Sequence, residues 1–228
     1  MTPNTLAFYT KQNSPLHIGI IPDGGRRWAK VNHSTLAEAY DKSREMLQKM
    51  AVFFFSKNVD TLSIYVASIE NFKRNSEEKD AFCGVVETSL RKDFLVMALH
   101  LQVKIRVVGD RNILTNSLLT SIKKIETDTF NHSKGIINLC IAYHPAHEIQ
   151  RAIEKSNHQG DFLEYLDIKK PLNFVIRTGN ANVLSNFLPL QSGFARLYFL
   201  EKLFNDLSID EVAEIYNTYL ELDLKYGE

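Results

Sequence analysis

A short stretch near the amino terminus, residues 17–30, combines the residue types that bind a diphosphate group. Its sequence is HIGIIPDGGRRWAK, in which an apolar run ends at Pro22 and an acid, two glycines and two arginines follow without a gap. This pattern predicts a buried strand, a tight turn at its carboxyl end and a helix that begins directly after the turn. In open α/β sheets, ligands bind at the carboxyl ends of the strands.

Each residue after this strand offers a different contact to a phosphate group. Gly24 and Gly25 let the backbone approach a ligand, and the first N–H groups of a helix favour an anion. Arg26 and Arg27 can donate paired hydrogen bonds to phosphate oxygens. Asp23 can hold a hard cation between its carboxylate and those oxygens. The alternative is that the turn uses these residues for backbone reasons alone and that the arginines face solvent.

The composition argues against partners that are recognised by overall charge. The chain has 228 residues, with 27 Lys and Arg against 27 Asp and Glu, so no net charge steers it to nucleic acid or to an acidic membrane. Cys83 and Cys140 lie in apolar runs, and there is no secretory signal pattern and no apolar run long enough to span a membrane. We therefore expect a cytoplasmic protein without a transmembrane segment that does not bind nucleic acid.

Segments with the patterns of strands and helices alternate along the chain. Residues 1–15 form a loose lead-in, and residues 16–228 contain no linker rich in Gly or Pro that would divide them. The expected strands are residues 18–21, 61–68, 103–108, 136–142, 172–176 and 197–200. The expected helices are residues 35–57, a helix that begins at a capping box of Asn75 and Glu78, residues 113–128, residues 146–156 and a terminal helix capped at Ser208. This order predicts an α/β fold, a single domain with a mostly parallel central sheet flanked by helices.

Polar clusters follow three of the expected strands. They are the turn at Asp23, residues 68–74 with the sequence SIENFKR, and residues 177–180 with the sequence RTGN. The carboxyl ends of parallel strands meet at one edge of a sheet, so we expect these clusters to lie along the same rim. The high content of Phe and Tyr would suit an apolar pocket for a substrate tail, although an ordinary core explains most of these rings.

The three clusters together resemble the signature motifs of the cis-prenyltransferases, the family of undecaprenyl diphosphate synthase-like proteins. HIGIIPDGGRRWAK resembles the opening motif H-x-x-x-I-M-D-G-N-G-R-W-A, SIYVASIENFKR resembles L-Y-A-F-S-x-E-N-W-x-R, and the stretch from Val175 to Phe199 resembles I-R-T-G-G-E-x-R-x-S-N-F…Y-x-E-x-Y-F. Their order and spacing match across nearly the whole chain. The resemblance implies the undecaprenyl diphosphate synthase-like fold with an apolar pocket, prenyl diphosphate substrates, Mg²⁺ as cofactor and a homodimer that pairs through the late helices.

The resemblance also implies roles for individual residues. Asp23 would be the essential acid that works with Mg²⁺, and Ser68 and Asn71 would support ionisation and proton handling. The positions that would hold substrate diphosphates are Gly24, Gly25, Arg26, Arg27, Arg74, Arg177 and Ser185. Arg196 departs from the family pattern, and its own charge could supply a further contact to a diphosphate. The positions expected to wall a prenyl pocket are Trp28, Phe54, Phe72, Phe82 and Val86.

Several departures from the family pattern resemble a lavandulyl-type branch, whose members join five-carbon units irregularly, head to middle, and sometimes cyclise them. They are the double arginine at Arg26 and Arg27, the Ala-His-Glu of residues 146–148 and the run of residues 189–195. Val183 replaces a family arginine, and Arg196 replaces the glutamate that helps to hold Mg²⁺, an exchange that departs from the lavandulyl-type branch as well.

The function expected from these residues is the irregular coupling of short allylic diphosphates such as dimethylallyl diphosphate, with or without cyclisation. Three alternatives remain open. The chain could be a regular cis-elongating synthase that uses isopentenyl diphosphate, a cyclase that ionises a single prenyl diphosphate, or a non-catalytic partner subunit that has kept the fold.

Overall fold

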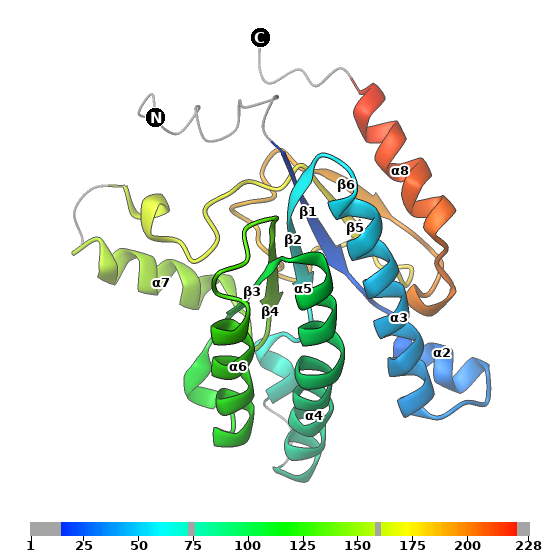
Figure 1. Cartoon of the computed structure of the whole chain (residues 1–228), viewed down its shortest axis with the longest axis horizontal. Coiled ribbons are helices and arrows are strands. Elements are labelled where there is room, and N and C mark those ends of the chain that lie inside the picture. Colours follow the sequence, from blue (N-terminus) through cyan, green and yellow to red (C-terminus); the bar gives the residue numbers. More distant parts are fainter. Residues whose placement is uncertain (1–14, 73–75, 158–160, 223–228) are drawn as a thin grey trace. The chain divides into compact units, whose positions relative to one another are not determined.

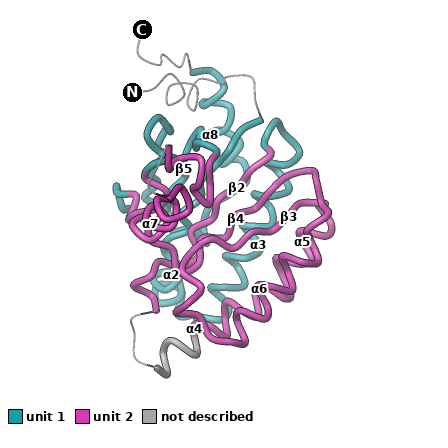
Figure 2. The backbone as a smooth tube through the Cα atoms, turned by 90° about the vertical axis from the view of Figure 1, so that its left-hand side faces the viewer, with its two compact units in different colours: residues 1–59, 170–183, 190–228 teal, residues 60–169, 184–189 magenta. Residues whose placement is uncertain are grey.

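The computed structural model describes residues 15–72, 76–157 and 161–222, and within these ranges it describes the side chains of all residues except 76–81. Most of the predicted lead-in, Arg74 and the predicted capping box of Asn75 and Glu78 lie outside this description. The chain forms two compact units (Figure 2). Unit 1 comprises residues 1–59, 170–183 and 190–228, and unit 2 comprises residues 60–169 and 184–189.

Unit 1 contains three parallel strands and the long helix predicted after the first motif (Figure 1). Its elements are β1 (Leu16–Ile21), α2 (Gly25–Val31), α3 (Leu36–Phe55), β5 (Phe174–Arg177), β6 (Arg196–Phe199), η5 (Phe204–Asp206) and α8 (Ile209–Glu221). Strand β5 pairs with β1 on one side and β6 on the other, and the register places Ile21, Arg177 and Phe199 side by side. The carboxyl ends of the three strands therefore lie at one edge.

Capping boxes begin both long helices of unit 1. The Thr35 side chain accepts a hydrogen bond from the Glu38 N–H, and the Glu38 carboxylate accepts one from the Thr35 N–H. Ser208 and Glu211 make the same reciprocal pair at the start of α8, so the predicted cap of the terminal helix is confirmed. Each box satisfies backbone donors that a helix start leaves unpaired.

Unit 2 contains the other three strands, which are also parallel, and most of the remaining helices. Its elements are β2 (Val59–Tyr65), η1 (Ile69–Phe72), α4 (Ser76–Ser89), η2 (Leu90–Phe94), α5 (Leu95–Leu101), β3 (Lys104–Val108), η3 (Arg111–Ile113), α6 (Asn116–Asp128), β4 (Ile136–Cys140), α7 (Pro145–Lys155) and η4 (Phe162–Tyr165). Strand β4 pairs with β2 and β3. All of the pairings described in both units are parallel, so the predicted α/β class with a mostly parallel sheet is confirmed.

Side chains from α6 and the turn that follows it cover the free edge of β3. The hydroxyl of Thr129 accepts a hydrogen bond from the Ile105 N–H (3.0 Å), and the carboxylate of Glu126 accepts one from the Val107 N–H (2.9 Å). The same Thr129 hydroxyl donates to the Ile125 carbonyl (2.8 Å). These bonds occupy backbone groups that an edge strand would otherwise expose to other chains.

Several element boundaries differ from the sequence prediction, including those of α6, β2 and α4. Helix α6 begins at Asn116 rather than at 113, because Asp110 caps a separate short turn and the Thr115 side chain caps α6 itself. Strand β2 ends at Tyr65, and Ser68 forms an isolated bridge to Tyr143 instead of extending the strand. The helix expected after the capping box of Asn75 and Glu78 is interrupted by a π-helical turn at Leu90–Phe94.

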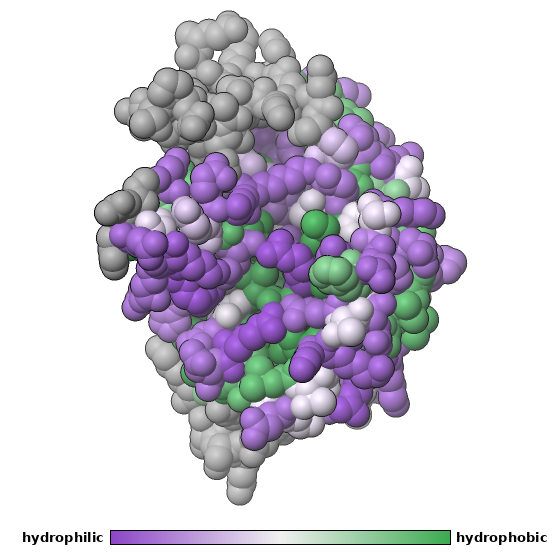
Figure 3. Space-filling model, turned by 60° about the vertical axis from the view of Figure 1, so that its left-hand side comes forward, coloured by the Kyte–Doolittle hydropathy of each residue, from purple (hydrophilic) through white to green (hydrophobic). Residues whose placement is uncertain are grey.

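On the face of the molecule shown in Figure 3, hydrophilic residues predominate and hydrophobic residues appear as patches between them. Among the large hydrophobic side chains that are exposed are Phe194, at 52%, and Leu197, at 41%, in and beside β6. A search of the described residues finds no helix that is long and apolar enough to cross a membrane.

Candidate active site

The turn after β1 has a backbone conformation at position 24 that favours glycine. Gly24 has a φ of +121°, and a Cβ added there would lie 2.8 Å from Cδ2 of Leu203. Helix α2 begins at the next residue, Gly25, so the chain reverses from strand to helix within the three residues Pro22, Asp23 and Gly24. The side chain of Asp23 consequently emerges at the carboxyl edge of the strands of unit 1.

Two arginines hold the carboxylate of Asp23, one on each oxygen. Nη2 of Arg27 lies 3.2 Å from Oδ1, and Nη2 of Arg177 lies 3.1 Å from Oδ2. The Arg177 side chain is 8% exposed and also donates to the Val183 carbonyl (2.6 Å), whereas the Asp23 and Arg27 side chains are 38% and 52% exposed. The predicted meeting of the first and third motifs is therefore present within unit 1. Two guanidinium groups with one shared acid form a site suited to an anion.

A residue that the sequence analysis did not single out, Thr178, fixes the backbone of Asp23. Its hydroxyl accepts a hydrogen bond from the Asp23 N–H (3.0 Å) and donates one to the Asp23 carbonyl (2.8 Å). The next residue, Gly179, has a φ of +86°, and a Cβ there would lie 2.5 Å from Nη2 of Arg27. The only sequence signal was the presence of both residues in the RTGN cluster after β5.

The other predicted residues of unit 1 lie at different distances from Asp23. Arg26 is exposed on α2 beside Gly25. Trp28 donates its indole N–H to Asp206 (2.7 Å) and has Nζ of Lys42 4.6 Å from its ring centroid. Arg196 is exposed at the amino end of β6, where it is level with Phe174 and hence three residues, roughly 10 Å, from the level of Arg177. The structure does not bring Arg196 to the Asp23 turn of its own chain.

Ser68 and Asn71 form a hydrogen-bonded pair in unit 2. Oδ1 of Asn71 accepts from the Ser68 N–H (2.9 Å) and from the Ser68 hydroxyl (3.1 Å). A backbone N–H can only donate, so this contact identifies the amide oxygen and fixes which way the Asn71 amide points. The NH₂ group of Asn71 is then the part of the side chain left to donate to a ligand oxygen.

Ser185 lies in a loop whose backbone is unusual at several positions. Ser185, Asn186 and Leu188 have positive φ angles, of 49°, 63° and 43°. The Tyr65 hydroxyl donates to the Ser185 carbonyl (3.1 Å), and the Tyr65 ring centroid lies 5.1 Å from that of Phe187. Left-handed conformations at residues other than glycine are costly and are found where the surrounding structure enforces them, often at functional sites.

The residues predicted to wall a prenyl pocket fall into two groups. In unit 2, the rings of Phe72 and Phe82 meet edge to face with centroids 5.6 Å apart, and Val86 follows Phe82 by one helical turn on α4. In unit 1, Phe54 is fully buried in α3 and packs edge to face against Phe174, with centroids 6.2 Å apart. Within the described residues, Phe54 therefore contributes to the core of unit 1.

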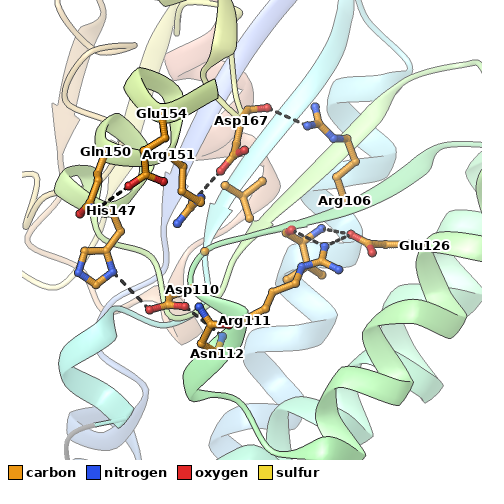
Figure 4. A pocket seen from close by; sticks show the side chains of 13 residues that line it. Arg106, Asp110, Arg111, Asn112, Glu126, His147, Gln150, Arg151, Glu154 and Asp167 are labelled. Carbon is orange, nitrogen blue, oxygen red and sulfur yellow. Dashed lines mark hydrogen bonds and ion pairs between the residues drawn. The ribbon is translucent and has the colours of Figure 1, made fainter. Parts of the chain in front are cut away.

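A pocket of about 620 Å³ opens in unit 2 at the carboxyl end of β3, and it is polar (Figure 4). Side chains of its walls contact one another: Arg111 pairs with Glu126, Arg151 pairs with Asp167, and Nδ1 of His147 lies 3.4 Å from Oδ2 of Asp110. Burial favours the protonated form of Asp167, but the hydrogen bonds and charges of Arg151 and Lys155 together outweigh it and lower the pKa of this carboxyl. None of the predicted site residues lines this pocket, so we do not assign the prenyl substrate to it.

Helix α7 also carries a buried acid beside the pocket. The Tyr143 hydroxyl donates to Oε2 of Glu148 (2.6 Å), and the Ile168 N–H donates to Oε1 (3.1 Å). Burial raises the pKa of Glu148, and the two hydrogen bonds oppose the shift without cancelling it.

The described residues include no group of three or more His, Cys, Asp and Glu that could hold a metal ion. Mg²⁺ is commonly bound by one or two carboxylates together with substrate phosphates. Asp23, partly exposed at the carboxyl edge of the strands, fits that arrangement, in which substrate oxygens complete the coordination.

Comparison with known proteins consistently finds prenyl-transferring enzymes. A family model described as "putative undecaprenyl diphosphate synthase" matches residues 21–227. An isoprenyl transferase of Rickettsia prowazekii is 32% identical over 225 residues, covering 93% of this chain and 97% of that protein. An isoprenyl transferase of Campylobacter jejuni is 29% identical over 222 residues, covering 95% of this chain and all of that protein.

Two solved structures are similar over nearly the whole chain. Lavandulyl diphosphate synthase from Lavandula x intermedia, in complex with dimethylallyl diphosphate, has a TM-score of 0.85 and 26% identity, covering 94% of this chain and 99% of that one. A probable undecaprenyl diphosphate synthase from C. jejuni has a TM-score of 0.81 and 26% identity, covering 95% and 100%.

Proposed function

Because the chain belongs to the undecaprenyl diphosphate synthase family and is a prenyltransferase, we propose that it couples short allylic diphosphates such as dimethylallyl diphosphate. We propose that the coupling is irregular, head to middle, and gives a lavandulyl-type diphosphate with or without ring closure. The likeness to lavandulyl diphosphate synthase and the double arginine of the first motif support this choice. The observation that carries the proposal is the Asp23 turn, where two guanidinium groups converge on one acid.

The proposed reaction begins with the loss of diphosphate from the allylic substrate. The C–O bond breaks and both electrons leave with the diphosphate, whose growing charge is stabilised by hydrogen bonds from Arg27 and Arg177. The double bond of the second prenyl unit attacks the cation, a new C–C bond forms, and a proton is lost. We propose that Ser68 and Asn71 support ionisation and this proton loss, as the family resemblance implies.

Mg²⁺ would be held by Asp23 together with diphosphate oxygens. When bound, it would neutralise charge on the leaving group. Arg196 stands where the family pattern has a glutamate and does not lie at the Asp23 turn of its own chain, so Asp23 and the substrate's own oxygens would supply the coordination of Mg²⁺.

A single assay separates the proposal from its alternatives. Purified protein is incubated with dimethylallyl diphosphate, with and without isopentenyl diphosphate, and the products are identified by mass spectrometry. A ten-carbon diphosphate formed from the first substrate alone supports irregular coupling. Monomeric cyclic products would support the single-substrate cyclase. Products only when isopentenyl diphosphate is present would support the second candidate, regular cis-elongation, which the likeness to a probable undecaprenyl diphosphate synthase favours.

The role of Asp23 is tested by Asp23→Asn, which keeps the size of the side chain and removes its charge. We expect turnover to fall below detection, because both the guanidinium groups and the metal lose their anionic partner. The circular dichroism spectrum should remain that of the wild type. The control is Asp128→Asn, at an acid that pairs with Lys124 on α6. Near-normal turnover in Asp23→Asn would contradict the proposed site.

We also propose a homodimer that involves the free edge of β6 and helix α8. Among the described strands β6 pairs only with β5, and it carries the exposed Leu197 beside the exposed Phe194. An edge strand with exposed apolar side chains is a surface that proteins usually cover. Leu197→Lys should give a monomer in light scattering, whereas Leu99→Lys, at an exposed leucine of α5, should not change the mass. An unchanged mass for both variants would contradict this interface.

A further inference from the structure

The hydroxyl of Thr178 is placed between the two backbone polar groups of Asp23. It is 3.0 Å from the Asp23 nitrogen, from which it accepts, and 2.8 Å from the Asp23 oxygen, to which it donates. Thr178 is 1% exposed and directly follows Arg177, the last residue of β5. One side chain thus binds both the N–H and the carbonyl of the residue that is the proposed catalytic acid, although the two residues are 155 positions apart in the sequence.

This contact is independent of the ion pair on the Asp23 side chain. Arg177 holds the carboxylate through Oδ2, whereas the Thr178 hydroxyl hydrogen-bonds to the Asp23 N–H and carbonyl. Gly179 completes the support, because its lack of a side chain lets the chain pass beside Arg27 and Cβ of Asp23. An aspartate side chain has few rotatable bonds, so the position of its carboxylate follows the position of its backbone closely.

We propose that Thr178 is a positioning residue, which holds the Asp23 backbone so that the carboxylate meets the diphosphate and its metal in a productive geometry. This inference rests on the proposed function of Asp23. Groups that react must be held within roughly 0.5 Å of the required place, and a displacement of about 1 Å can lower the rate about a hundredfold.

The fold should survive the loss of this hydroxyl. The Asp23 N–H also donates to the Ile21 carbonyl (3.0 Å), and the Asp23 carbonyl also accepts from the Phe204 N–H (3.1 Å). Each group therefore keeps a partner when Thr178 is replaced by valine, which has nearly the same shape. We therefore expect Thr178→Val to stay folded while the Asp23 backbone and carboxylate become more mobile.

A matched control exists in unit 2. Thr129 is fully buried, and its hydroxyl likewise accepts from one backbone N–H and donates to one carbonyl. Thr129→Val removes the same two kinds of hydrogen bond at a position that the proposed function does not use. Both variants should lower the midpoint of thermal unfolding, and the assays are run well below the lower midpoint.

The kinetic test compares Thr178→Val, Thr178→Ser and Thr129→Val. We expect kcat of Thr178→Val to fall about tenfold to a hundredfold with a smaller change in KM, because geometry at the reacting group is lost while most substrate contacts remain. Thr178→Ser restores the hydroxyl and should recover most of the rate. Thr129→Val should keep kcat within about twofold of the wild type. Equal kcat for Thr178→Val and Thr129→Val would overturn the proposal.

A second readout does not depend on turnover. Mn²⁺ binding in the presence of inorganic pyrophosphate is followed by electron paramagnetic resonance, and Thr178→Val should bind the ion more weakly than Thr129→Val. Unchanged Mn²⁺ affinity in Thr178→Val would also overturn the proposal. If Asp23→Asn keeps its activity, the proposed function itself fails, whereas an inactive Asp23→Asn beside a normal Thr178→Val refutes only the role of Thr178.

Discussion

Gly24 is the residue on which the direction of the Asp23 side chain depends. Its φ of +121° is unfavourable for any L residue, and an added Cβ would approach the side chain and Cα of Leu203 at 2.8–3.2 Å. Gly24→Ala should therefore lower the free energy of unfolding by about 1–3 kcal/mol and reduce turnover, because the turn must open to accept the methyl group. Urea unfolding and a rate assay measure the two effects.

The control for this prediction is Gly84→Ala. Gly84 is exposed on α4, and a Cβ there would meet no atom within 4 Å. Alanine favours the helix by about 1 kcal/mol over glycine, so this variant should be as stable as the wild type or more stable. Equal changes in the free energy of unfolding of both variants would show that the positive φ at Gly24 does not disfavour alanine.

The sequence predicted some residues of the site and missed others for a physical reason. Asp23 and Arg177 could be predicted to meet, because both follow strands and the carboxyl ends of parallel strands share an edge. The hydrogen bonds between the Thr178 hydroxyl and the Asp23 backbone could not be predicted, since they depend on the orientation of one hydroxyl within a loop. For Arg196 the sequence predicts a contact with substrate diphosphate, but the strand register places this residue at the amino end of β6, away from the Asp23 turn of its own chain.

Among the elements, α7 contains a buried acid, Glu148, whose titration should affect stability. The pKa of Glu148 is raised in the folded protein by burial, above its ordinary value near 4.5. Between the unfolded and the folded pKa, the folded protein holds the proton more often than the unfolded chain does. The contribution of Glu148 to stability is therefore largest at low pH and decreases as the pH rises through that window.

Glu148→Gln removes this titration and keeps an oxygen that can accept a hydrogen bond. The free energy of unfolding should fall less between pH 4.5 and pH 7 in Glu148→Gln than in the wild type, as measured by urea unfolding at each pH. Glu154→Gln, at an exposed acid on the same helix, should follow the wild type. A parallel pH dependence in all three proteins would contradict the role of burial at Glu148.

Element types were predictable, and their ends were less so. The capping box of Ser208 and the long apolar stripe of α3 identify helices from local sequence alone. The start of α6 was misplaced because Ile113 continues its apolar pattern, while the caps at Asp110 and Thr115 divide the segment. Periodicity reports which face is buried, whereas side-chain hydrogen bonds to the backbone decide where a helix begins.

At the scale of the whole molecule, the chain passes between the two units four times, at 59/60, 169/170, 183/184 and 189/190. Unit 1 is consequently built from three separate stretches of sequence, and a single cut cannot release it. The sequence prediction of one domain over residues 16–228 rests on the absence of a linker. We therefore predict that the chain unfolds as one cooperative domain.

Trp28, the single tryptophan, allows this prediction to be tested together with ligand binding. Its fluorescence reports on unit 1, where it contacts Asp206, whereas far-ultraviolet circular dichroism also reports on α4, α5, α6 and α7 of unit 2. For a single domain, the two signals should give the same midpoint of thermal unfolding.

Inorganic pyrophosphate with Mg²⁺, at about 100 times its Kd, should stabilise the folded chain by about 2.7 kcal/mol and raise both midpoints by about 5–10 °C. In Asp23→Asn the shift should be much smaller, because the anionic partner of the metal is gone. A circular dichroism transition that pyrophosphate leaves in place while the fluorescence transition moves would show instead that unit 2 unfolds independently, and the single-domain prediction would be wrong.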